Sequence, residues 1–212
     1  MEEQGKLNAE KEYWDDWAGS MDGSGWRYKY LRNCQRLLVS ILDVKEDISV
    51  LDVGCGTGHA LGMISMLING KGLFYGIDFS HGMIEKAKEN FNDQSQFHFM
   101  EADAAAIPLS DDQFDIIICS NSFHHYPDPL KALNEMQRLL KAGGKVYILD
   151  PTADTWPIKI IGSFGKLFKH SREKFYSTKE FARLITGAKL KYAGCRKIKM
   201  LQRIHMGEKE KI

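Results

Sequence analysis

Three glycines at alternate positions give this chain its strongest chemical signature. Residues 50–60 read VLDVGCGTGHA, in which the glycines are Gly54, Gly56 and Gly58. The apolar, branched residues before them are typical of a buried parallel strand, and the glycines leave the turn without side chains where the backbone bends sharply or a ligand approaches. A helix that begins there directs its unpaired N–H groups at whatever occupies the turn. The pattern predicts a site for a nucleotide-like cofactor; a tight strand-to-helix turn without a ligand is the alternative.

An acidic residue stands at the distance that such a site requires. The apolar run at residues 73–77 ends on Asp78, twenty residues after Gly58. A carboxylate that closes the second strand accepts hydrogen bonds from the hydroxyls of a ribose. The alternative for Asp78 is a charge at a helix N-terminus beside a Ser80 cap. Since this alternative does not account for the separation of the two signals, we favour the cofactor site.

Alternating strand and helix patterns must position these residues. Apolar runs predict strands at residues 50–53, 73–77, 97–100, 114–119 and 145–149. Residues 191–206 predict two short strands, a closing hairpin whose last strand runs antiparallel. The order of the elements favours a parallel sheet with helices on both faces.

Helix caps can be predicted from short polar motifs. The expected caps are Ser80, Asp128 followed by Pro129, and Ser177 with Glu180. We expect the helix that starts at Pro129 to end at Gly143 and Gly144.

Two amphipathic segments precede the glycine turn. Tyr13 and Trp17 share a helical face, and apolar residues repeat at helical spacing over residues 31–41. Residues 19–25, GSMDGSG, predict a flexible hinge between the two segments. The first helix is therefore either a lid over a site or a fixed packing helix.

Composition limits the class of protein. The 212 residues are 43% hydrophobic and 27% charged, which is typical of one soluble globular domain. No apolar run approaches the ~20 residues that cross a bilayer, and the polar, acidic N-terminus differs from a secretory signal. We therefore expect a cytoplasmic protein without a transmembrane segment. The four cysteines show no CxxC spacing, so we expect neither a metal site nor a disulfide framework.

The net charge of +1 conceals two parts of opposite sign. Up to Ile158 there are 14 basic and 24 acidic residues, a charge of −10; from Lys159 onward there are 15 and 4, a charge of +11. A basic tail can meet nucleic acid, an anionic membrane surface or an acidic substrate. Attraction between the two parts, within one fold or across a homodimer, is the alternative. Because basic and aromatic residues do not alternate, we expect no nucleic-acid partner and at most a weak membrane contact.

Five ordered blocks resemble the class I S-adenosylmethionine-dependent methyltransferases, in the small-molecule branch of ubiquinone and menaquinone methyltransferase-like proteins. The blocks are VLDVGCGTG at 50–58, GIDFSHGMI at 76–84, EADAAAIPL at 101–109, FDIIICSNSFHHYPDP at 114–129 and LKAGGKVYILDP at 140–151. The resemblance implies an α/β fold: a Rossmann-like, seven-stranded, mostly parallel sheet with helices on both faces and an antiparallel last strand. Within one domain, 1–212, it implies an N-terminal helical cap (1–44), a cofactor-binding core (45–151) and a C-terminal part that completes the sheet and the acceptor side (152–212).

The resemblance also implies S-adenosylmethionine as cofactor and a set of residues that bind it. The set is Asp52, Gly54, Cys55, Gly56, Gly58, Asp78, Phe79, Met83, Asp103, Ala104, Cys119 and Ser120. Asp52 would supply negative charge near the ammonium and sulfonium groups, and Asp78 would hold the ribose. Phe79 and Met83 offer apolar surface to the adenine, whose amino group would donate to Asp103. The carbonyl groups that end the fourth strand would accept from the ammonium.

The implied reaction is an in-line displacement. An O, N, S or C nucleophile of a small molecule attacks the methyl carbon, and S-adenosylhomocysteine leaves. Since the sulfonium is already a good leaving group, the protein mainly aligns the reactants, and a general base is optional. His124 and His125 are the candidate bases, because they follow the fourth strand at the ligand-binding edge of the sheet. A role in shaping that loop is the alternative, most of all for His125.

Aromatic residues are candidates for the acceptor pocket, with packing in the core as their alternative. They are Tyr13, Trp14, Tyr28 and Tyr126.

Two other functions stay open. One is a catalytically silent S-adenosylmethionine-binding partner or sensor protein, and the other is an NAD(P)-dependent oxidoreductase. The oxidoreductase is less favoured, because the chain has GxGxG in place of GxGxxG and lacks an evident YxxxK pair.

Overall fold

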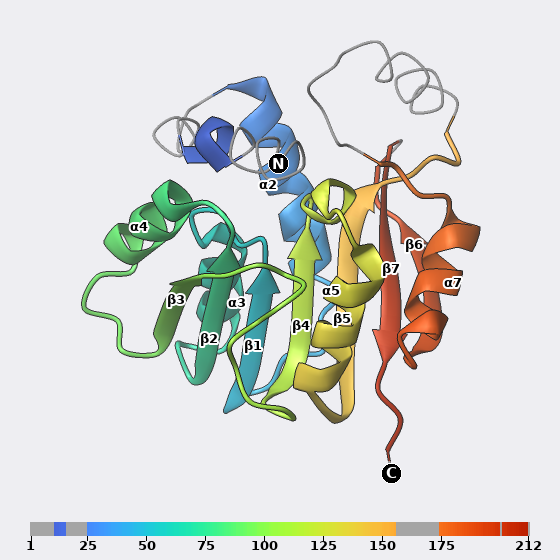
Figure 1. The fold of residues 1–212 in the computed structure, drawn as a ribbon. Helices are drawn as coiled ribbons and strands as arrows, with labels where there is room; N and C mark the ends of the chain where they lie inside the picture. The colour runs from blue at the N-terminus through green and yellow to red at the C-terminus, as the bar shows by residue number, and fades with distance from the viewer. Residues whose placement is uncertain (1–10, 16–24, 156–173, 200, 212) are drawn as a thin grey trace, which may run out of the picture.

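One mixed sheet runs through the part of the chain that the structure, a computed structural model, describes: residues 11–15, 25–155, 174–199 and 201–211 (Figure 1). Seven strands follow the order β3-β2-β1-β4-β5-β7-β6. Their bounds are β1 (Ile48–Val53), β2 (Gly72–Asp78), β3 (Phe97–Glu101), β4 (Phe114–Ser120), β5 (Leu140–Pro151), β6 (Lys191–Lys197) and β7 (Gln202–Glu208). The first five are parallel, and β7 runs antiparallel to both β5 and β6. The expected fold class is confirmed, including the closing hairpin.

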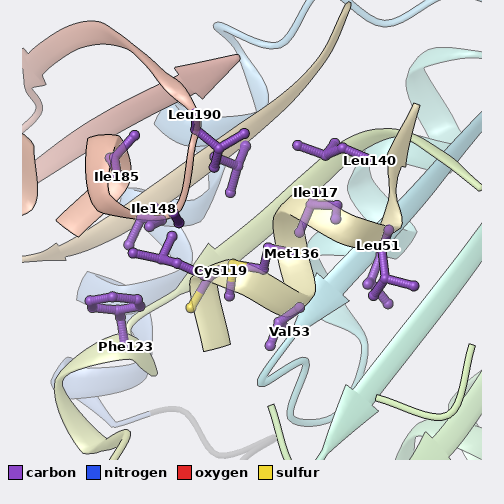
Figure 2. Close-up of a cluster of buried hydrophobic side chains, with 14 of the residues drawn as sticks. Leu51, Val53, Ile117, Cys119, Phe123, Met136, Leu140, Ile148, Ile185 and Leu190 are labelled. Atoms are coloured by element: carbon purple, nitrogen blue, oxygen red, sulfur yellow. The ribbon is translucent and has the colours of Figure 1, made fainter. Parts of the chain in front are cut away.

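Helices cover both faces of the sheet (Figure 1). They are α2 (Trp26–Val39), α3 (His59–Leu67), α4 (His81–Asn90), α5 (Pro129–Leu139) and α7 (Thr178–Gly187), with a 3-10 turn, η1 (Phe123–His125). Successive side chains of a strand point to opposite faces. Val50 accordingly belongs to the cluster beneath α2 and α3, and Leu51 to the cluster beneath α5 and α7. Figure 2 shows this second cluster, where Ile117 and Ile148 of the sheet lie with Met136 and Ile185 of the helices.

The predicted helix caps are confirmed. Ser80 Oγ accepts a hydrogen bond from the backbone N–H of Met83 (3.1 Å). The Asp128 carboxylate accepts one from the backbone N–H of Lys131 (3.0 Å). Ser177 and Glu180 form the reciprocal capping box of α7. These contacts are local in sequence, which explains why short motifs predict them.

The predicted end of the α5 helix is wrong. The helix stops at Leu139, and Leu140 already has extended backbone (φ −68°, ψ 137°) at the start of a strand much longer than residues 145–149. Gly143 has φ +78° and exchanges no helical bond; its N–H donates to the Lys209 carbonyl at 2.9 Å. The pairing of β4 with β5 is irregular here, so the glycines serve a bulge in the sheet.

Some expectations fall outside the described residues. Trp17 and residues 19–24 of the predicted hinge are among them. The helical repeat over residues 31–41 corresponds to α2, whose last residue is Val39. None of the described helices is both long and apolar enough to cross a membrane.

Gly76 offers a test of the packing beneath the turn. A Cβ at this position would lie 2.6 Å from a ring carbon of Phe99 and 2.8 Å from Cys55 Sγ. We expect Gly76→Ala to lower the free energy of unfolding by about 1–3 kcal/mol, measured by urea denaturation, because the partners must shift. Gly187→Ala is the control, since a Cβ at position 187 would meet no atom closer than Leu130 Cδ1, at 3.4 Å. Equal destabilisation of both variants would contradict this account.

Candidate functional site

The glycine turn lies where the strand order of the sheet reverses. β1 is flanked by β2 on one side and β4 on the other, and open α/β sheets bind ligands at the carboxyl ends of such strands. The backbone N–H groups of Gly54 and Cys55 both donate to the Ile77 carbonyl, at 2.8 and 2.9 Å. The turn is thereby fixed to the end of β2.

Two glycines of the turn are required by space and by backbone conformation. Gly54 has φ +77°, and a Cβ there would lie 2.0 Å from Ser122 Oγ in the loop after β4. Gly58 has φ +82° at the N-cap of α3, where a Cβ would meet the rings of Phe91 and Phe99 at 2.8 and 2.9 Å. Only glycine fits both demands without strain.

Asp78 joins the turn to the start of α4. Its Oδ2 accepts from the Gly56 N–H at 2.9 Å, and its Oδ1 accepts from the Ser80 N–H at 3.0 Å. Burial raises the pKa of Asp78, while these backbone hydrogen bonds oppose the rise. An ionised carboxylate has about four lone-pair sites, so these two bonds leave capacity for the hydroxyls of a ligand.

Asp52 is the most unusual polar group of the site. It is 1% exposed in β1, and its Oδ1 has no hydrogen-bond partner among the residues that the structure describes. Burial and the neighbouring Asp78 raise the pKa of Asp52 to about 8. A buried acceptor without a partner is costly, and a cationic ligand would remove that cost. The buried Asp52 carboxylate therefore fits a ligand that carries an ammonium or a sulfonium group.

Most of the other predicted cofactor residues lie at the carboxyl ends of β2, β3 and β4, at the same edge of the sheet as the glycine turn. Phe79 follows β2 and is half-buried, with Lys11 Nζ 5.6 Å from its ring centroid. Asp103 follows β3; it is exposed, and its Oδ1 accepts from the Ala105 N–H at 2.9 Å beside the half-buried Ala104. The buried Cys119 and Ser120 end β4. Met83 is 2% exposed inside α4, so it contributes packing below this edge.

His124 and His125 have different surroundings in η1. His124 is buried, and its Nδ1 lies 2.8 Å from Oδ1 of Asp150, a fully buried residue of β5. The two imidazole centroids are 4.0 Å apart. Burial and the neighbouring His124 lower the pKa of His125 to about 3, so its ring is neutral at physiological pH. The His124–Asp150 pair holds one ring nitrogen in a defined orientation.

Sequence reasoning missed Asp150. A signal was present, because Asp150 ends an apolar strand as Asp78 does. Its partner stands 26 residues away, so only the pairing of β4 with β5 brings the two side chains together.

The aromatic candidates separate into two groups. The Tyr126 hydroxyl donates to the Val53 carbonyl (3.1 Å), accepts from Ser122 Oγ (3.0 Å) and lies 3.4 Å from Cys119 Sγ, which favours a structural role. Trp14 packs edge-on against His125, with centroids 5.2 Å apart. Tyr13 is 53% exposed, and Tyr28 is half-buried in α2. Of the four, Trp14 lies beside a candidate base.

Comparisons with known proteins agree with this geometry. A protein family described as "Methyltransferase domain" matches residues 44–202. Demethylmenaquinone methyltransferase of Staphylococcus aureus (strain MRSA252) is 31% identical over 160 residues, 71% of this chain and 63% of its own length. The Staphylococcus haemolyticus enzyme of the same name is 33% identical over 144 residues, 63% and 60% of the two chains. The chain thus spans about three fifths of the curated relatives that it matches.

Solved structures share the fold. A chain from the complex of the Haloferax volcanii Trm112 methyltransferase activator with a methyltransferase has a TM-score of 0.81 at 20% identity, over 93% of this chain and 97% of that one. An S-adenosylmethionine-dependent methyltransferase from Aquifex aeolicus has a TM-score of 0.67 at 24% identity, over 82% and 88%. The [4+2]-cyclase SpnF has a TM-score of 0.70 at 16% identity, over 85% and 81%. The fold therefore accommodates more than one chemistry.

The raised pKa of Asp52 predicts how stability depends on pH without a ligand. The folded protein keeps this proton up to about pH 8, whereas the unfolded chain releases it near the ordinary value of 3.8. The stabilising contribution is therefore complete below pH 3.8 and is lost as the pH rises through about 8. We expect the melting temperature of Asp52→Asn, relative to the unsubstituted protein, to rise steadily between pH 4 and 8.

The control for this measurement is Asp103→Asn, which makes the same substitution at an exposed position. Parallel pH profiles for Asp52→Asn and the unsubstituted protein would contradict a proton held on Asp52.

Proposed function

The chain belongs to the methyltransferase-domain family, and on that premise we propose that it transfers a methyl group from S-adenosylmethionine to a small-molecule nucleophile. The observation that carries the proposal is the buried Asp52 carboxylate, whose Oδ1 has no hydrogen-bond partner among the described residues, two residues before the glycine turn at the switch point. S-adenosylmethionine supplies a methyl group bound to a sulfonium sulfur; when the nucleophile takes the methyl group, the S–CH3 bond breaks and the neutral thioether S-adenosylhomocysteine leaves. The positive charge that would neutralise Asp52 and the methyl group that is transferred therefore belong to the same ligand.

The proposed cofactor contacts follow the strand ends. Asp52 faces the ammonium and sulfonium end, directly or through water, and the N–H groups of the turn at residues 54–58 face the methionyl part. Asp78 binds the ribose through the lone pairs that Gly56 and Ser80 leave unused. Phe79 packs against the adenine beside Asp103 and Ala104. The carbonyls of Cys119 and Ser120 complete the set by accepting from the ammonium.

The acceptor would lie over the carboxyl ends of β4 and β5. His124 is the candidate base there, because Asp150 orients its ring from below at 2.8 Å. An acceptor with an acidic O–H, N–H or S–H would transfer its proton to this ring as the nucleophile attacks. The names of the Staphylococcus relatives make quinols and phenols the first acceptor class to test.

A second candidate function is binding of S-adenosylmethionine without methyl transfer. We keep this second candidate because the cyclase SpnF has a similar fold, and its name denotes a reaction other than methyl transfer. The fold therefore does not by itself imply methyl transfer. Turnover separates the two functions, because a silent binding protein binds the cofactor and produces no S-adenosylhomocysteine.

Location and assembly are further proposals. We place the protein in the cytoplasm, with a weak contact between its basic C-terminal part and an anionic membrane surface from which a lipophilic acceptor is reached. Alternatively, the basic C-terminal part binds the acidic part of a second copy and forms a homodimer. A Trm112-like activator is a further candidate partner, since the similar Haloferax volcanii chain comes from a complex with Trm112. Sedimentation with anionic vesicles and analytical ultracentrifugation test these proposals.

Titration calorimetry tests the cofactor assignment. We expect S-adenosylmethionine to bind, and Asp52→Asn to weaken that binding by about tenfold or more, because the charge that meets the cation is lost. Glu12→Gln is the control, since Glu12 is exposed. Absence of binding to the unsubstituted protein would overturn the proposed function.

Kinetics with a panel of quinols, phenols, amines and thiols tests the proposed base. With an acceptor that must lose a proton, we expect His124→Ala to lower kcat by about a hundredfold and to flatten its pH profile. His98→Ala, an exposed histidine of β3, should leave both unchanged. An unaltered pH profile for His124→Ala would remove this residue from the chemistry.

A further inference from the structure

A short helical segment, residues 11–15, contacts the edge of the sheet at which the carboxyl ends of β2, β3 and β4 lie. We call it the cofactor edge, because the proposed cofactor residues follow these strands. Lys11 forms an ion pair with Glu101, the last residue of β3. Trp14 packs against His125 after β4, and Asp15 contacts the start of α4 after β2. Five consecutive residues therefore reach the ends of three strands that carry candidate site residues.

Asp15 makes the most specific of these contacts. Its Oδ1 accepts hydrogen bonds from the Gly82 backbone N–H (2.9 Å) and from Ser80 Oγ. Ser80 is itself the N-cap of α4, so Asp15 adds a second acceptor at the positive end of this helix. Partial burial raises the pKa of Asp15, but the hydrogen bonds from Ser80 and Gly82 hold it below its ordinary value. The contact is therefore charge-assisted at neutral pH.

The contact lies directly beside the proposed ribose and adenine positions. Asp78 and Phe79 immediately precede Ser80, and Lys11 Nζ lies 5.6 Å from the Phe79 ring centroid. A nucleoside bound between the turn and Phe79 would lie next to residues 11–15. Residues 11–15 would then border the path by which it leaves.

We propose that Asp15 is a positioning residue that fastens residues 11–15 over the cofactor edge and so slows the release of S-adenosylmethionine and its product. The inference rests on the proposed function for the identity of the ligand. The fastening itself is a property of the protein alone, so it can be measured without a ligand. A packing helix that never opens is the competing account.

Three variants separate these accounts. Asp15→Ala removes both hydrogen bonds, whereas Asp15→Asn keeps an acceptor oxygen and removes only the charge. Glu12→Ala is the matched control, because it removes an acidic side chain from the same segment at an exposed position.

Millisecond hydrogen exchange of the ligand-free full chain is the first measurement. After correction for intrinsic rates, we expect exchange at residues 11–15 to be about five- to tenfold faster in Asp15→Ala, with a smaller increase in Asp15→Asn. Glu12→Ala should match the unsubstituted protein. Equal exchange in Asp15→Ala and the unsubstituted protein would overturn the fastening.

Dissociation of S-adenosylhomocysteine, followed by stopped flow, is the second measurement. We expect its rate to rise several-fold in Asp15→Ala, to a lesser degree in Asp15→Asn, and not in Glu12→Ala. Faster exchange with unchanged dissociation would overturn the link to ligand release. If the unsubstituted protein binds no S-adenosylhomocysteine, the proposed function fails, while the exchange experiment still decides the fastening.

Discussion

The parallel pairing of β1 with β2 is the constraint on which the site depends. Its register sets Val53 opposite Ile77, so that the glycine turn and Asp78 emerge side by side. Two N–H groups of the turn then share the Ile77 carbonyl, and a third donates to Asp78. Because three of the five turn residues are glycines, these backbone bonds are the main contacts that fix its position. Every contact proposed for the methionyl and ribose groups starts from this arrangement.

Charge is the physical basis of the selectivity that we propose for the site. Asp78 lies close enough to Asp52 to raise the pKa of Asp52, which burial in the sheet raises most. In the ligand-free protein the cost of burying the Asp52 carboxylate is met by a proton. A ligand with a permanent positive charge offers a better solution, since it cannot lose that charge. A dinucleotide pyrophosphate would have the opposite effect, which agrees with the family to which the chain belongs.

Local features could be predicted from the sequence, and features that depend on distant partners could not. The glycine spacing, the Ser80 cap and the Ser177 capping box involve neighbours within a few residues, so their chemistry is legible in a single segment. The glycines at 143 and 144 resembled a helix end, but their partner is Lys209, which only the closed sheet brings near. Asp15 and Asp150 escaped notice for the same reason, because their partners lie 65 and 26 residues away.

Tyr126 has a consequence for the order of events in the site. Its hydroxyl binds the Val53 carbonyl, just before the glycine turn, while its backbone belongs to the loop that carries His124. The Tyr126 side chain therefore connects the two parts of the site that we propose for the cofactor and for the acceptor. If the proposed acceptor displaces the histidine loop, the Tyr126 hydrogen bond would carry that displacement to Val53, next to the proposed methionyl position. Such a linkage favours an ordered sequence of binding, in which the first ligand sets the shape that the second one meets.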